Sequence, residues 1–135
     1  MSSIMQALGV SASGLAAQRT RLNATASNVA NVQTTRGPDG GPYQRLDVVF
    51  ETVNAGEGVA GVQVAEVRPD EAEPRQVYDP GHPDADVNGY VGMPNVNLVE
   101  EMVNMITAQR AYEANASAVD VAKNMARSAI SIAES

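Results

Sequence analysis

The chain has 135 residues, no Cys, no Trp, one Phe and four Tyr, and its 16 acidic residues against 9 basic ones give a net charge of −7. This balance argues against a nucleic-acid partner, because phosphate binding requires a basic face. The absence of Cys excludes a disulfide scaffold, thiolate catalysis and Cys-based zinc sites, and no apolar run approaches the ~18 residues that a membrane span needs.

The first segment, residues 3–31, is predicted to be a long helix. Leu8, Leu15, Leu22 and Val29 recur at a spacing of seven, which places them on one stripe of a helix. The stripe is narrow and partly polar. It fits either an ordinary amphipathic helix packed on its own domain or a helix packed against neighbouring subunits.

The middle of the chain is predicted to hold a small β element in long loops. Residues 34–42 are dense in Gly and Pro and break the helix. Alternating side chains over residues 43–53 and again over 59–67 predict a short hairpin, and residues 75–78 fit a third short strand. These strands are too few for an independent core.

From Asn95 the pattern becomes helical again and runs to about residue 133. Pro94 and Asn95 give a start signal, with Asn95 as the candidate N-cap. The residues that recur at a spacing of seven in this segment are Leu98, Met105, Tyr112 and Val119, with Met102 four residues after the first of them.

Together these elements predict a mainly α fold, with two long terminal helices packed as a coiled-coil hairpin and a small β-hairpin and long-loop insertion between them. We expect residues 1–34 and 95–135 to form one helical domain, with residues 35–94 as the insertion. Leu occurs at only five positions and most apolar residues are Ala and Val, so a lone chain would bury little apolar area. The composition therefore indicates a core that neighbouring subunits complete.

Charge and candidate catalytic groups are concentrated in the insertion. Residues 37–94 hold eleven acids and three bases, whereas residues 1–36 hold three Arg and no acid. His82 lies among Asp residues, but the stretch lacks the spacing of calcium loops and the converging ligands of a metal site. The acidic run at 70–73 lies between prolines and is interpreted as solvent-facing, because acid–base catalysis needs two carboxylates in different, partly buried environments. We therefore predict no catalytic residue, cofactor or metal site.

Two motifs lie at opposite ends of the chain. The first consists of SGLAAQ at residues 13–18 and ASNVANVQT at residues 26–34, and the second of NVNLVEEMVNM at residues 95–105 and RAYEAN at residues 110–115. The pair resembles the signatures of the bacterial flagellar axial proteins, a family of rod, hook and hook-associated subunits. The short insertion, with GPDGGPY and VYDPGHPDA, is similar to that of the proximal-rod members.

The resemblance implies a non-enzymatic subunit of the proximal rod within the periplasm, which assembles helically through its terminal helices into the drive shaft that transmits motor torque. The implied partners are further copies of the chain, other flagellar rod proteins, the flagellar type III export apparatus and the adaptor protein between the export gate and the MS ring. Export by that route would need no cleavable secretory signal, and none is visible after Met1. Nucleic acid, small-molecule substrates and direct membrane insertion are not expected.

Two alternatives remain beside this interpretation. One is another short flagellar axial subunit or a non-flagellar secreted protein that forms helical filaments. The other, from a different class, is a small hydrolase that depends on His82 and carboxylates. For the rod subunit, we expect the two apolar stripes to meet in an assembly seam, with two asparagines near the end of the first helix bonding loop or neighbour backbone. The predicted interface residues are Leu8, Leu15, Leu22, Asn28, Val29, Asn31, Leu98, Met102, Met105, Tyr112 and Val119.

Overall fold

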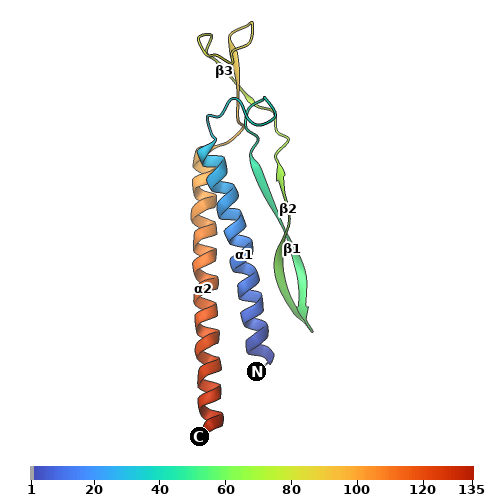
Figure 1. Cartoon of the computed structure of the whole chain (residues 1–135), viewed down its shortest axis with the longest axis vertical. Helices are drawn as coiled ribbons and strands as arrows, with labels where there is room; N and C mark the ends of the chain where they lie inside the picture. The colour runs from blue at the N-terminus through green and yellow to red at the C-terminus, as the bar shows by residue number, and fades with distance from the viewer. Residues whose placement is uncertain (1) are drawn as a thin grey trace.

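The computed structural model describes residues 2–135 and shows an elongated molecule built on two antiparallel helices (Figure 1). Helix α1 spans Ser2–Ala30 and helix α2 spans Leu98–Glu134, and both chain ends lie at the same end of the molecule. A β-hairpin lies on the other side of α1, so α1 forms the central layer and contacts both neighbours. The predicted arrangement of two long terminal helices around a small β region is confirmed.

The buried residues of the two helices are small or polar. They are Gly14, Ala17, Ala24, Thr25 and Asn28 on α1 and Glu101, Ala108 and Ala122 on α2. At Gly14 the helices approach so closely that a Cβ atom would lie 2.7 Å from the side-chain nitrogen of Asn115. The absence of a side chain at Gly14 therefore permits the close contact.

The apolar core is as thin as the composition suggested. Within residues 2–135, no Leu, Ile, Met or Phe side chain is fully buried. Apart from Pro94, the buried apolar side chains are Ala17, Ala24, Val91, Val96, Ala108 and Ala122. Because burial stabilises in proportion to apolar area, such small side chains contribute little each.

Strands β1, Leu46–Gly56, and β2, Val59–Pro69, form an antiparallel hairpin. Gly56 and Gly58 have φ values of 141° and 68°, which only Gly adopts readily, and they close the turn at the predicted place. Both strands end later than predicted, because pairing continues to Gly56 and Pro69. The hairpin is tied to α1 where the Val62 N–H donates to the Ser13 hydroxyl at 3.2 Å.

A second two-stranded sheet lies beyond the opposite end of the helices from the chain termini (Figure 1). It pairs β3, Arg75–Tyr78, antiparallel with β4, Tyr90–Met93. β3 was predicted and β4 was not, because four residues that include a glycine carry no readable alternation. The rings of Tyr78 and Tyr90 pack edge to face with centroids 5.4 Å apart.

Helix α2 begins later than predicted, and its N-cap is Asn97 rather than Asn95. The Asn97 side chain accepts hydrogen bonds from the N–H groups of Val99 and Glu100. Val96, which lies between the two asparagines, is buried. Its backbone is non-helical, and the helix begins only after it.

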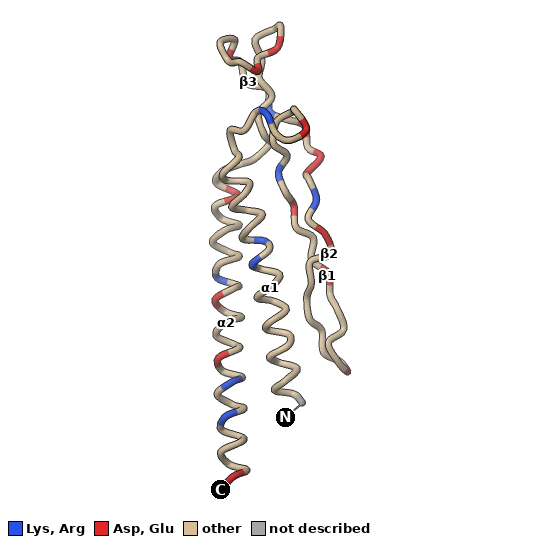
Figure 2. Tube along the Cα trace, viewed as in Figure 1, with Lys and Arg blue, Asp and Glu red and all other residues tan. Residues whose placement is uncertain are grey.

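Charged side chains are unevenly distributed over this frame. Figure 2 shows basic but no acidic groups on α1, both signs on α2, and acidic groups gathered over the strands and loops. Within residues 2–135, neither helix is apolar enough over a sufficient length to cross a membrane.

Candidate assembly interface

A buried polar cluster joins the end of α1 to the start of β1 and the first turn of α2. At its centre is Asn28, which is 1% exposed. Its Oδ1 accepts hydrogen bonds from the Leu46 N–H at 2.8 Å and from the Tyr43 hydroxyl at 2.7 Å. Its Nδ2 donates to the Leu46 carbonyl at 3.0 Å and to Glu101 Oε2 at 3.2 Å. One side chain therefore holds three segments that are far apart in the sequence.

The carboxylate of Glu101 is as buried as Asn28, and Arg45 neutralises it. Arg45 Nε donates to Glu101 Oε1, and Arg45 Nη1 lies 3.7 Å from a carboxylate oxygen of Asp47 and from one of Asp70. Burial disfavours the charged guanidinium, but the hydrogen bond and charge of Glu101, with Asp47 and Asp70, outweigh this and raise the pKa of Arg45. A buried charge is costly without its partner, so removal of Arg45 would strongly destabilise this arrangement. We refer to Asn28, Tyr43, Arg45, Leu46 and Glu101 as the Asn28 cluster.

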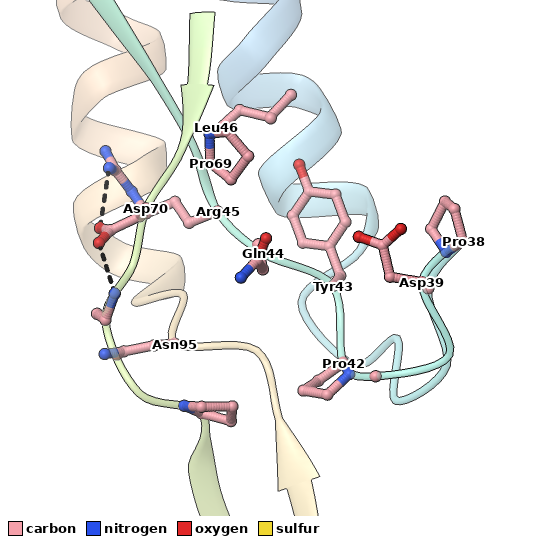
Figure 3. A pocket seen from close by; sticks show the side chains of 14 residues that line it. Pro38, Asp39, Pro42, Tyr43, Gln44, Arg45, Leu46, Pro69, Asp70 and Asn95 are labelled. Atoms are coloured by element: carbon pink, nitrogen blue, oxygen red, sulfur yellow. Dashed lines mark hydrogen bonds and ion pairs between the residues drawn. The ribbon is translucent and has the colours of Figure 1, made fainter.

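The outer edge of the Asn28 cluster borders an open cleft of about 380 Å³ (Figure 3). Arg45 and Asp70 face each other there, and Asp70 Oδ1 also accepts from the Ala72 N–H at 2.9 Å. The hydroxyl of Tyr43 points toward α1. These polar groups are engaged in holding the loops together.

Asn28 and Asn31 were both expected at the interface, and the structure places both of their side chains in hydrogen bonds within the chain. Asn31 Nδ2 donates to the Ser27 carbonyl at 2.9 Å, and Asn31 Oδ1 accepts from the Thr34 hydroxyl at 3.0 Å. The two asparagines thus shape the end of α1 and the loop after it.

The predicted stripe on α1 lies on the face turned away from the hairpin. Leu15 is two residues from Ser13, which corresponds to about 200° around a helix, and Ser13 is the residue that contacts β2. All four members of the stripe are half-buried, and they are Leu8, Leu15, Leu22 and Val29.

The predicted residues on α2 lie beside the buried line of this helix. That line follows Glu101, Ala108 and Ala122, which are spaced by multiples of seven. Met105 and Val119 are half-buried, whereas the exposed members are Leu98 at 42%, Met102 at 52% and Tyr112 at 37%. The structure therefore brings neither predicted stripe into the centre of the helix pair.

His82 and the acidic residues around it form a loop contact. His82 Nδ1 accepts from the Asp84 N–H at 3.0 Å, and the Asp84 carboxylate accepts from the Thr35 hydroxyl at 2.7 Å and pairs with Arg36. The hydrogen bonds from Thr35 and then Arg36 lower the pKa of Asp84. These contacts tie the loop after β3 to the loop after α1.

The sequence interpretation missed two groups of residues. Tyr43, Arg45 and Glu101 were not predicted to form a cluster. Glu101 offered a signal, because it lies seven residues before Ala108 on the buried line of α2, where a charged side chain needs an oppositely charged partner. The other group was absent from the predicted interface residues and consists of further exposed apolar residues on α2, which are Val99, Val103, Ile106, Val121, Met125, Ile130 and Ile132.

Comparisons with known proteins bear on what this surface is for. The family model of flagella basal body rod proteins matches residues 8–38, and that of the C-terminal region of flagellar basal body rod FlgEFG proteins matches residues 87–132. The flagellar basal-body rod protein FlgC of Borreliella burgdorferi is 43% identical, over 96% of this chain and 97% of its own length. The FlgC proteins of Salmonella typhimurium and Aquifex aeolicus are each 46% identical, over 90% and 93% of this chain and 92% and 93% of their own lengths. The chain therefore belongs to the FlgC family of flagellar basal-body rod proteins, and it is a structural subunit of the rod and not an enzyme.

Proposed function

We propose that this subunit belongs to the proximal part of the rod and builds it helically through α1 and α2, so that the packed helices form the drive shaft that transmits motor torque. The observation that carries the proposal is the distribution of apolar side chains. The core of the lone chain holds only small ones, while most of the large ones of α2 are exposed and the others, Met105 and Val119, are half-buried. Contacts with neighbouring copies and with other rod proteins would bury them.

The interface residues follow from the same distribution. The stripe of Leu8, Leu15, Leu22 and Val29 would pack on helices of neighbouring subunits, with the exposed and half-buried residues beside the buried line of α2 as its counterpart. Such packing at a seven-residue spacing would have coiled-coil character. Leu98, Met102, Met105, Tyr112 and Val119 form that counterpart. Asn28 and Asn31 would act indirectly, because they fix the end of α1 relative to α2 and β1.

Export is the second part of the proposal. We propose that the flagellar type III export apparatus passes the chain unfolded, and that the adaptor protein between the export gate and the MS ring receives the first subunits. Support comes from the thin core, because a chain that buries little apolar area is easily kept unfolded before assembly.

Aspartate substitution in the stripes tests the assembly seam. Leu15→Asp and Leu98→Asp each place a charge where apolar contact with a neighbour is proposed, so we expect loss of swimming in soft agar and loss of the rod from purified basal bodies. Asn23→Asp is the matched control, since it adds the same charge at an exposed position of α1 outside the stripe. A motile strain that carries either stripe variant would contradict the proposed seam.

A further inference from the structure

Gln18 of α1 holds a buried side-chain oxygen, Oε1, that has no hydrogen-bond partner, and it is the one such polar atom within residues 2–135. The side chain of Asn28, in contrast, makes four hydrogen bonds. A buried acceptor without a donor loses its hydration and gains nothing in return, so native structures rarely keep one without a reason. Gln18 also ends the SGLAAQ motif, in which Ser13 contacts the hairpin and Gly14 contacts α2.

Gln18 lies on the border between the side of α1 that faces α2 and the stripe of Leu8, Leu15, Leu22 and Val29. At about 100° per residue, its side chain projects about 40° from Gly14, where α2 makes its close contact. In the opposite sense it projects about 40° from Leu22 and about 60° from Leu15. Gln18 as a whole is half-buried, so its side chain reaches the edge of the stripe although Oε1 is turned inward.

The nearby amide of α2 does not satisfy Gln18. Asn115 packs at Gly14, one helical turn along α1 from Gln18, but its Nδ2 donates to the Ala111 carbonyl of its own helix at 3.0 Å. The terminal amide of a Gln side chain rotates over a broad range, so Oε1 can turn toward the stripe without a movement of α1. A donor that a neighbour places at the edge of the stripe is then within reach of it.

We propose that Gln18 is a specificity-determining residue of assembly, and that the neighbouring subunit packed on Leu15 and Leu22 donates a hydrogen bond to Gln18 Oε1. The proposal rests on the proposed stripe contact and names the polar group that recognises the neighbour. An apolar stripe selects poorly among apolar helices, whereas a polar residue at its edge favours the partner and register that satisfy it. The donor is a neutral hydroxyl or amide, because residues 1–36 hold three Arg and no acid and disfavour a Lys or Arg.

Substitution by Met removes the acceptor and keeps a flexible, unbranched side chain. The two expected consequences have opposite signs. The lone chain no longer buries an unpaired oxygen, so the urea midpoint of purified Gln18→Met should rise. The contact in the rod loses a hydrogen bond, so incorporation of the variant should fall about 2- to 10-fold in competition with the native chain.

Competition within one strain measures the incorporation. Native and Gln18→Met chains are produced together, and mass spectrometry compares the ratio of their peptides in purified basal bodies with that in whole cells. Gln33→Met is the matched control, because Gln33 is exposed beyond the end of α1, and it should change neither the ratio nor the urea midpoint. Gln18→Glu keeps an oxygen acceptor at the same reach, so it should incorporate better than Gln18→Met, although its half-buried charge makes it the less stable chain.

Three results would overturn the proposal. They are incorporation of Gln18→Met equal to that of the native chain, a fall in both its incorporation and its urea midpoint, and incorporation of Gln18→Glu no better than that of Gln18→Met. The stripe contact fails separately. Exclusion of Leu15→Asp from rods that accept Gln18→Met normally would leave the stripe contact intact and remove only the hydrogen bond, whereas a motile Leu15→Asp strain would remove the stripe contact itself.

Discussion

Asn28→Asp would place a second carboxylate in the cluster that joins α1, β1 and α2. The substitution conserves shape, so its effect measures charge and hydrogen bonding rather than packing. In the native chain, Nδ2 of Asn28 donates to the Leu46 carbonyl and to Glu101 Oε2. An aspartate would turn this donor into an acceptor that faces two acceptors.

The expected loss of stability follows from these distances. Two unit charges at the 3.2 Å separation of Asn28 Nδ2 and Glu101 Oε2 repel by about 5 kcal/mol at an effective dielectric constant of ~20. Loss of the hydrogen bond to Leu46 adds about 1 kcal/mol. Relaxation and water entry reduce the sum, so we expect the free energy of unfolding to fall by about 3–5 kcal/mol, the range found when a buried charge loses its compensation. This is a large share of the stability of a small domain.

The measurement is urea unfolding of the purified chain at pH 7, followed by far-UV circular dichroism. Asn23→Asp is the control, because it adds the same charge at an exposed position of the same helix. The double variant Asn28→Asp/Glu101→Gln restores one carboxylate and one amide to the pair. We expect it to be more stable than Asn28→Asp alone by about 2 kcal/mol, within the range of coupling for residues in contact.

A difference in unfolding free energy of less than about 0.5 kcal/mol between Asn28→Asp and Asn23→Asp, the scatter of ordinary surface substitutions, would contradict charge repulsion in the Asn28 cluster. A double variant no more stable than Asn28→Asp alone would contradict it as well. A variant already unfolded without urea agrees with the prediction, provided that Asn23→Asp remains folded.

Two further predictions concern the helix contact and the loops. Gly14→Ala should lower the melting temperature, because the new Cβ would displace Asn115, whereas Gly9→Ala has open space and should be stabilising by about 1 kcal/mol through helix propensity; equal effects would contradict the close contact. The lowered pKa of Asp84 means that its ionised form stabilises the fold at a pH above 3.8, its usual value, and that this stabilisation is lost as the pH falls through the lowered pKa. The stability difference between the native chain and Asp84→Asn should therefore be present at about pH 6 and disappear once the pH has fallen below the lowered pKa, whereas a difference that persists in stronger acid would show that ionisation is irrelevant.

The terminal helices and the first hairpin were accessible from the sequence because their signals are periodic. The apolar residues from Leu8 to Val29 recur at a spacing of seven, and α1 ends within a residue of the predicted position. Gly56 and Gly58 mark the turn of the hairpin. The start of α2 was less accessible. Asn95 and Asn97 are both good N-caps, and the burial of Val96, a tertiary effect, decides between them.

The Asn28 cluster and strand β4 depend on contacts between distant segments. Asn28 and Glu101 are 73 residues apart, and nothing local indicates that they touch. The apolar spacing on α2 indicated a helix with a buried side, but it did not show that the small residues at Ala108 and Ala122 take that side and leave Leu98 and Met102 exposed. That choice depends on how closely α1 approaches, and the absence of a side chain at Gly14 permits the close approach.

We propose that α1 and α2 complete their apolar core in neighbouring subunits. A density map of the assembled basal body that resolves side chains along both helices tests this proposal most directly. We expect Leu15, Leu22 and Met102 each to be buried against a neighbouring subunit. Helices whose Leu15 and Met102 face solvent in the assembled rod would contradict the account.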